Sequence, residues 1–557
     1  MGGVHGYTPR VADQTAVIKA VAGNRTLTRV AGAYALFILT EYSVWIAMLV
    51  YAYQHGGATT AGLIVIAQTV PASLLAPFIA TVADRRSPAV LLIGGYLIQA
   101  AAMGITAVAL LLGLSPFAAY AAAVVASTAV AATRPAHAVL VPGLVRSAAQ
   151  LSAMNVVSGW VESVGIAVAG GMTGALLTIG SPGLVFAVCS GFAIIATLLV
   201  ASLRSPPLAV DDTGDTPASV LADVVDGIHL LINERHPRLL VIILALAWVV
   251  VGALDVLFVV LAINVLHQGQ AWAGYLNMAF GIGSLLAGAI TAMLVGRRLG
   301  APILAASLVM SLGLGLTALS SNVFATAALL AVVGMGSAVL EMATRALLQR
   351  AVPAQLLGRI FGVVEGVTMA GLALGSLLTT VLIHLGGPTA ALAGVAAVLP
   401  VGLVVCGRSL LTLDSSATVP IVEIALLRSL PHFAPLPGPA LEGLARSLEC
   451  VRLPAGAVLM REGDAGDRFY AVADGELDVT IAGAHVSTQR RGDGIGEIAL
   501  LRQVPRTATV TTVSDVTLYA LDSSPFLAAV TGHAGTHAAA SGIAHDRLTG
   551  DEASGRR

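Results

Sequence analysis

The stretch GDGIGEIALLRQVPRTATV, Gly492–Val510, specifies a small anionic ligand in more detail than any other part of the chain. Gly496 and Glu497 open a short apolar turn, and Arg506 follows behind a proline. A helix that begins here offers free backbone N–H groups and the positive end of its dipole to a phosphate. Arg506 adds a two-pronged charged contact, and Glu497 can accept a hydrogen bond from a sugar hydroxyl. A ligand with both a phosphate and a sugar satisfies both residues.

This stretch resembles the phosphate-binding cassette of cyclic nucleotide-binding domains, whose pattern runs Gly-Glu-x-Ala-Leu-Leu, a gap, and Pro-Arg-x-Ala-Thr-Val. The resemblance covers about 421–530, although Ile495 stands where the family usually has an aromatic residue. It implies a soluble β-roll with flanking helices. The cyclic nucleotide would contact seven residues: Gly496, Glu497, Ile498, Ala499, Arg506, Thr507 and Ala508. A cassette that has kept the fold and lost its ligand is the alternative, and the presence of both Glu497 and Arg506 argues against it.

The residue after the arginine bears on the choice between cAMP and cGMP. Thr507 stands where some family members have alanine, and by resemblance a hydroxyl there contacts the amino group of guanine. Many domains with threonine at this position still bind cAMP. We therefore expect cAMP first and cGMP second as the regulatory ligand.

The composition divides the chain into a membrane part and a soluble part. The 557 residues have a mean hydropathy of +0.89 and only 11% charged side chains, and about half of these charges follow Gly407. Such values are far from those of soluble globular proteins. No basic patch with interleaved aromatic residues suggests nucleic acid, and the three cysteines have neither disulfide nor metal spacing. We expect no nucleic-acid partner, no metal and no enzymatic activity.

Twelve apolar segments are long enough to cross a lipid bilayer, which takes about 20 residues. No apolar core precedes the first of them, so we expect no cleavable signal peptide. The segments begin near Val30, Thr60, Ala89, Pro116, Ala153, Gly183, Leu240, Trp272, Ala301, Val323, Phe361 and Thr389. The sequence predicts an all-α membrane part with twelve spans.

Arginine placement predicts the orientation of these spans. Arginines fall at the N-terminus, in alternate loops and after the last span, whereas the opposite loops carry no Lys or Arg. These uncharged loops lie around His55, Ser115, Ser181, His267, Ser321 and His384. We therefore expect a multi-pass protein of the plasma (inner) membrane with both termini and the nucleotide domain in the cytoplasm.

A repeated pattern divides the spans six and six. Ala132-Thr133-Arg134 is followed by Pro142, and Ala343-Thr344-Arg345 is followed by Pro353 at the same distance. The expected domains are a cytoplasmic segment, a first bundle, a linker with an amphipathic helix, a second bundle, a short linker, the nucleotide domain and a tail. Their bounds are 1–29, 30–203, 204–238, 239–407, 408–420, 421–545 and 546–557.

The membrane part resembles the major facilitator superfamily, specifically its efflux-type members. Ala83-Asp84-Arg85-Arg86 resembles the charged loop that follows span two in that family, which implies a conformational role for Asp84, Arg85 and Arg86. GIAVAGGMTG, residues 165–174, resembles a glycine-rich antiporter motif, with Gly171 in place of the family's proline, which leaves export in doubt. AVPAQLLGRIFGVVEG, residues 351–366, matches the start of span eleven more closely.

Acidic residues inside the predicted spans are candidates for transport, because ionisable groups are costly in lipid. They are Glu41, Glu162, Asp255, Glu341 and Glu365. Glu41 is followed by Tyr42 and Trp45, so a carboxylate and an aromatic face could meet one cation. The alternative is that each pairs with an arginine such as Arg134 or Arg345 and locks one conformation. The acidic excess favours proton coupling or a cationic lipophilic substrate over an anionic one.

The leading hypothesis is a proton-coupled secondary transporter, with export favoured, that a cytoplasmic cyclic nucleotide regulates. A cyclic-nucleotide receptor on a transporter scaffold without net transport is the alternative, and a nucleotide domain that only mediates assembly is a third possibility. The sequence leaves the substrate, the direction of transport and the oligomeric state open.

Overall fold

The computed structural model of the chain describes residues 21–84, 87–145, 148–201, 227–229, 231–294, 297–352, 354–416, 421–431, 433–434, 436, 438–502 and 504–531. Contacts divide the chain into two units. The first consists of long helices up to Ala417, and the second is formed mainly by Thr418–Arg557.

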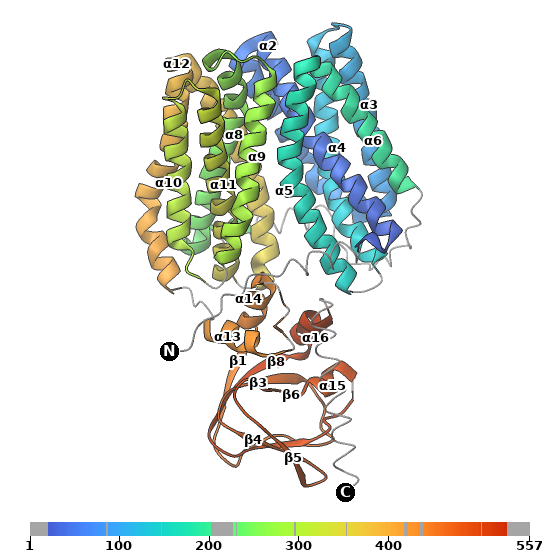
Figure 1. Ribbon diagram of the computed structural model, residues 1–557, viewed down its shortest axis with the longest axis vertical. Coiled ribbons are helices and arrows are strands. Elements are labelled where there is room, and N and C mark those ends of the chain that lie inside the picture. The colour runs from blue at the N-terminus through green and yellow to red at the C-terminus, as the bar shows by residue number, and fades with distance from the viewer. Residues whose placement is uncertain are drawn as a thin grey trace. The chain divides into compact units, whose positions relative to one another are not determined.

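In the residues of the first unit that the structure describes, all regular elements are helices (Figure 1). Their bounds are α2 Arg25–Asp84, α3 Pro88–Leu111, α4 Pro116–Leu144, α5 Ala148–Ile179, α6 Pro182–Ala201, α8 Arg235–Val260, the π-helix η1 Leu261–Val265, α9 Ala271–Met293, α10 Gly300–Thr317, α11 Val323–Ala351 and α12 Ala354–Ser416. Among the described residues, nine helices are long and apolar enough to cross a membrane. These helices indicate a multi-pass membrane protein.

Prolines and one asparagine mark the starts of three of these helices. Pro88 lies in the first turn of α3 and Pro116 in that of α4, where a missing backbone N–H is harmless. Asn322 caps α11 by accepting from the N–H groups of Phe324 and Ala325 at 2.9 and 3.1 Å.

The longest helices, α2 and α12, each contain a sharp break. Gly57 has φ 66° and Gly387 has φ 75°, which places both in the left-handed region that favours glycine. Each helix contains an apolar segment of 49 residues, about 70 Å long, whereas a bilayer core is about 30 Å thick. A break near the middle suits a segment that crosses, turns and returns. Twelve spans in two repeats remain a prediction.

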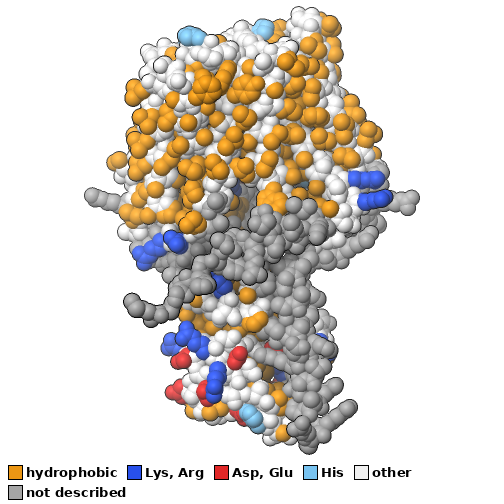
Figure 2. Space-filling model, viewed as in Figure 1, with side chains coloured by type: hydrophobic (Ala, Val, Ile, Leu, Met, Phe, Trp, Pro, Cys, Tyr) orange, Lys and Arg blue, Asp and Glu red, His pale blue; other side chains and the backbone are white. Residues whose placement is uncertain are grey.

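The helices of the first unit form two groups. In one, α3 contacts α4 and α6, and α2 contacts α4 and α6; in the other, α8 contacts α12, α9 contacts α11, and α10 contacts both α11 and α12. Contacts of α2 with α8, α9 and α12 join the groups. Figure 2 shows hydrophobic side chains over this unit, with Lys and Arg gathered at one margin.

Several helices extend beyond the spans that the sequence predicts. Arg134 and Arg345, which the orientation argument assigns to loops, lie inside α4 and α11. The last span likewise continues to Ser416, so most of the linker expected at 408–420 is helical. Asp84 is the last residue of α2. Arg85, Arg86 and the first part of the predicted amphipathic helix, residues 219–226, lie outside the described residues, while 227–229 and 231–233 are helical.

The second unit contains two four-stranded antiparallel sheets with flanking helices, in the strand orders β1-β8-β3-β6 and β2-β7-β4-β5. Its elements are α13 Ile421–Ser429, α14 Gly438–Arg446, β1 Glu449–Leu453, β2 Val458–Met460, β3 Arg468–Asp474, β4 Leu477–Ile481, β5 Ala484–Gln489, β6 Gly494–Ile495, α15 Glu497–Arg502, β7 Thr509–Thr512, β8 Val516–Asp522 and α16 Ser523–Thr531. One core packs the helices on the first sheet through the buried rings of Phe433, Phe469 and Phe526. A second core, with Val472, Leu477 and Leu518, lies among the strands.

Candidate functional site

The cassette begins at a glycine that no other residue could replace without strain. Gly496 joins β6 to α15 with φ +93°. A Cβ atom there would lie 2.9 Å from the carbonyl oxygen of Arg468 and would clash with Nη1 of Arg506. The backbone can therefore pass close to the arginine only because residue 496 has no side chain.

Replacing Gly496 with alanine should lower cyclic-nucleotide affinity roughly fivefold or more, because the new methyl group displaces the guanidinium of Arg506 from its place at the pocket. Gly483→Ala is the matched control, since Gly483 has φ +80° and open space around its Cβ position. It carries similar strain in the turn between β4 and β5 and should leave affinity unchanged. Calorimetry on the full-length protein measures both. Equal affinities for the two variants would contradict this role for Gly496.

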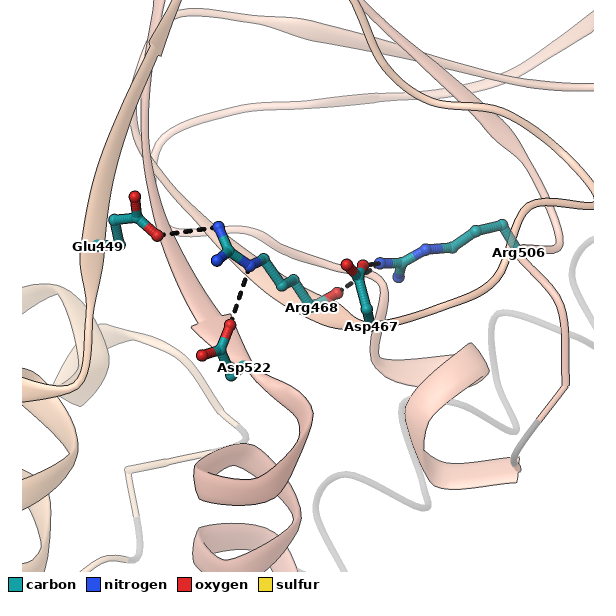
Figure 3. Close-up of polar contacts among 5 residues, drawn as sticks. All are labelled: Glu449, Asp467, Arg468, Arg506 and Asp522. Atoms are coloured by element: carbon teal, nitrogen blue, oxygen red, sulfur yellow. Dashed lines mark hydrogen bonds and ion pairs between the residues drawn. The ribbon is translucent and has the colours of Figure 1, made fainter.

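Arg506 is the most completely enclosed cation of this site, with 4% of its surface exposed. Its guanidinium donates to the carbonyl oxygen of Arg468 at 2.7 Å and lies 3.4 Å from Oδ1 of Asp467 (Figure 3). It also donates to the carbonyl oxygen of Gly496 at 3.2 Å. Asp467 is itself largely exposed. Because this carboxylate partner is solvated, a phosphate anion can replace it beside the buried guanidinium.

The backbone of Arg506 is held as firmly as its side chain. The Arg506 N–H donates to the carbonyl oxygen of Asp464 at 2.8 Å, and the Gly463 N–H donates to the Arg506 carbonyl at 2.8 Å. The loop before β3 therefore positions the arginine before any ligand arrives, which lowers the entropy lost on binding.

A pocket of about 360 Å³ opens beside the cassette, within the size range of small-molecule sites. All seven cassette residues predicted to contact the ligand line it, and Glu497 is 1% exposed. The strand residues of the lining are absent from the sequence prediction. They are Met460 from β2, Val479 and Ile481 from β4, Val486, Ser487 and Gln489 from β5, Ile495 from β6, and Val510 from β7.

Arg468 forms an ion-pair cluster on the far side of its own carbonyl group. Its guanidinium lies 2.9 Å from Glu449 and 2.9 Å from Asp522, the last residue of β8 (Figure 3). These two carboxylates raise the pKa of Arg468, so its charge is permanent. Burial, and then Asp467, raise the pKa of Tyr470 on the same strand, which keeps its phenol neutral. These exposed pairs contribute little to stability.

In the membrane unit, one arginine joins two of the predicted carboxylates. The Arg134 guanidinium on α4 lies 2.7 Å from Oε2 of Glu41 on α2 and 2.5 Å from Oε1 of Glu162 on α5. It also hydrogen-bonds Tyr42. The pairing that the sequence leaves as the alternative is thus present for both carboxylates. One guanidinium is thus shared by two carboxyl groups that belong to different helices.

The other helix group carries a smaller version of this arrangement. Nε of Arg345 lies 3.0 Å from Oε1 of Glu341, one turn earlier on α11. The charges of Glu365 on α12 and Glu162 on α5 also act on Glu341, so carboxylates from three helices lie near one another. Asp255 on α8 differs from these residues, because the partner that the described residues give it is the neutral indole N–H of Trp45.

His137 is an intramembrane polar residue that sequence reasoning missed. It lies one turn beyond Arg134 on α4, is 4% exposed and hydrogen-bonds the hydroxyl of Tyr96 on α3. The rings of Tyr34 and Phe37 on α2 pack against it. The sequence prediction assigns Arg134, three residues earlier, to a loop, so only the extension of α4 to Leu144 shows that His137 lies within a helix. Because this buried histidine has a hydrogen-bond partner, the simplest interpretation is a structural role in the core.

Hydrogen bonds join the two helix groups near the glycine breaks. Thr380 on α12 donates to the carbonyl of Ala58 at 3.2 Å, and Ser376 donates to that of Gly62 at 3.4 Å. His384 donates from Nδ1 to Thr380 at 2.8 Å, so its Nε2 accepts from Thr59 at 3.3 Å. The groups are therefore closed together on the side of the uncharged loops.

The glycine-rich stretch 165–174 has a packing role in the structure. A Cβ atom on Gly170 would lie 2.6 Å from the backbone nitrogen of Met278 on α9, and one on Gly174 would lie 2.8 Å from the ring of Tyr275. Thr178 and Tyr275 then share a hydrogen bond of 3.2 Å between their hydroxyl groups. α5 and α9 thus approach closely because these positions lack side chains.

Two protein families match separate parts of the chain. The family model described as Major Facilitator Superfamily matches residues 30–315. The one described as Cyclic nucleotide-binding domain matches residues 450–533. The cassette and its pocket lie within the second match, and the bridge at Arg134 lies within the first.

Curated proteins resemble the second unit over short stretches. The chain is 43% identical over 76 residues to the cGMP-dependent protein kinase egl-4 of Caenorhabditis elegans, which covers 14% of this chain and 10% of the kinase. It is 42% identical over 91 residues to the cAMP-dependent protein kinase regulatory subunit of Dictyostelium discoideum, which covers 15% and 28%. The chain thus spans less than a third of the length of either relative.

Among solved structures, the regulatory domain of Toxoplasma gondii PKA with cAMP is 33% identical. The match covers 22% of this chain and 46% of that chain, with a TM-score of 0.20. The sensor domain of the transcriptional regulator DNR from Pseudomonas aeruginosa is 22% identical and covers 22% of this chain and 92% of its own, with a TM-score of 0.21.

Proposed function

Because the chain belongs to the major facilitator superfamily and carries a cyclic nucleotide-binding domain, we propose that it is a secondary transporter whose cycle is regulated by a cyclic nucleotide. One observation carries the regulatory half of this proposal. Arg506 is buried at a pocket that Glu497 also lines, and its carboxylate partner, Asp467, is exposed to solvent. A 3′,5′-cyclic nucleotide supplies the phosphate for the first residue and the ribose hydroxyl for the second.

The transported species is best matched by a cationic or lipophilic small molecule, moved by exchange with protons. Around Arg134 and Arg345 the structure gathers four carboxylates, those of Glu41, Glu162, Glu341 and Glu365, against two guanidinium groups. This net negative charge attracts cations and repels anions. Asp255, with only an uncharged partner among the described residues, is the carboxyl group best suited to pick up and release a proton.

The orientation in the membrane is inferred from the positions of Lys and Arg on the surface. The margin of the membrane unit at which Lys and Arg gather in Figure 2 fits the cytoplasmic side, and the uncharged loops fit the opposite side. With twelve spans, both termini and the nucleotide domain then face the cytoplasm of a cell enclosed by a plasma (inner) membrane. The contacts of Thr380 and Ser376 near the uncharged loops support a state that is closed to the outside, from which an exporter takes up its substrate.

Transport is tested with full-length protein reconstituted into proteoliposomes with an imposed pH gradient. The expected result is flux of at least one lipophilic cation from a panel that includes tetraphenylphosphonium and ethidium, and no flux with the gradient collapsed. Proteoliposomes that bind cAMP and yet move none of the panel would favour a receptor on a transporter scaffold.

A further inference from the structure

The nucleotide pocket has two walls of different chemistry. The cassette forms one wall and supplies Arg506 and Glu497. The strands of the β2-β7-β4-β5 sheet form the other and supply mainly apolar side chains, among them Val479, Ile481 and Val510. If the phosphate and ribose lie on the cassette, the flat base of the same ligand lies against the strand wall.

Two polar side chains interrupt this apolar wall, and both come from β5. Ser487 and Gln489 are two residues apart on one strand, so both side chains point to the same face of the sheet. Both line the pocket and are half-buried. Nε2 of Gln489 donates to Oγ of Ser487 at 3.0 Å, so the hydroxyl group orients the carboxamide. An oriented carboxamide beside a base-sized apolar surface can read a base edge.

We propose that Gln489, oriented by Ser487, reads the 6-position of the purine and selects adenine. This inference rests on the proposed binding of a cyclic nucleotide. A carboxamide presents a hydrogen-bond acceptor beside a donor, which matches the 6-amino group of adenine and its neighbouring ring nitrogen N7. Guanine presents two acceptors at the corresponding edge, O6 and N7, so one of them would face the carboxamide oxygen.

The alternative residue for base recognition is Thr507, which the cassette resemblance connects with guanine. Thr507 also lines the pocket, but it directly follows Arg506 and belongs to the cassette wall. A hydroxyl there is better placed for the phosphate and sugar than for a base on the strands. The two assignments therefore differ in which substitution alters base selectivity.

The test is calorimetry on the full-length protein in detergent with cAMP, cGMP and cyclic inosine monophosphate, in which an oxygen replaces the 6-amino group. The wild-type protein should bind cAMP at least about fivefold more tightly than the other two. Gln489→Met keeps the side chain's length and removes its hydrogen bonds. It should weaken cAMP, leave the inosine nucleotide within about twofold, and so remove the selectivity. Thr507→Ala, the matched variant in the cassette, should change the affinities for all three nucleotides to a similar degree and so keep the preference for cAMP.

Several results would overturn the proposal. Selectivity that survives Gln489→Met, or that is lost in Thr507→Ala instead, assigns base reading to another residue. Equal weakening of all three nucleotides by Gln489→Met shows that the side chain only supports the fold. A wild-type protein that binds all three equally refutes adenine selection. A wild-type protein that binds none of the three at millimolar concentration refutes the nucleotide site itself. This outcome is therefore distinguishable from a failure of adenine selection alone.

Discussion

Replacing Arg506 with alanine should weaken binding of cAMP to the full-length protein by at least about tenfold. The guanidinium is 4% exposed and is held by the carbonyls of Arg468 and Gly496, so it loses little entropy when it meets a phosphate. Removing a charge-assisted, partly buried contact costs on the order of 2–5 kcal/mol. Calorimetry or competition with a fluorescent cyclic nucleotide measures the change.

The control for Arg506→Ala is Arg468→Ala in the same domain. Arg468 carries an equal charge but directs it at Glu449 and Asp522, away from the pocket. Because exposed ion pairs are worth about 0–1 kcal/mol, this variant should keep nearly all of its affinity. Equal losses in the two variants would mean that net charge, and not the buried contact, governs binding.

Replacing Glu41 with glutamine should abolish proton-driven flux or its pH dependence while the protein still folds. Glu41 shares Arg134 with Glu162, so the guanidinium retains one carboxylate partner in the variant. What is lost is a negative charge that a cationic substrate or a proton can compete for. Flux in proteoliposomes across external pH measures the effect, and unchanged cAMP binding verifies that the nucleotide domain is intact.

The companion variants separate mechanism from folding. Glu162→Gln should resemble Glu41→Gln, because both carboxylates hold the same guanidinium. The double variant leaves Arg134 without either carboxylate in the membrane interior, a cost of several kcal/mol, so it should insert poorly. Wild-type flux at every pH in Glu41→Gln would remove this carboxylate from the mechanism.

Local chemistry is what the sequence predicts best. The cassette motif lies within one short stretch of sequence. The structure places the seven residues that the motif predicts to contact the ligand at one pocket. Its geometry depends on neighbours in the chain, such as the positive φ of Gly496. Assignment of their roles in ligand binding remains a prediction.

Partners that come from different elements are harder to predict. The bridge of Glu41, Arg134 and Glu162 joins three helices. The spacing of residues along one helix does not show which of its faces packs against which other helix, so these pairs could not be predicted. The strand wall presents the same difficulty, because Ser487 and Gln489 join the cassette only through sheet pairing.

Helix ends were misjudged for a physical reason. A span of about 20 residues is set by bilayer thickness, whereas a helix continues past the bilayer as long as its backbone hydrogen bonds can form. α4 therefore runs on to Leu144 and α12 to Ser416. Arg134 consequently lies within a helix, where it pairs with carboxylates instead of marking a loop.

Regulation of transport by the nucleotide is tested most directly by tetraphenylphosphonium flux in proteoliposomes with and without cAMP on the side of the nucleotide domain. The wild-type rate should change several-fold on addition of cAMP, since a ligand that prefers one state shifts the cycle toward it. Arg506→Ala should transport at the wild-type basal rate and fail to respond. Identical rates with and without cAMP, in protein that calorimetry shows to be nucleotide-bound, would contradict the account.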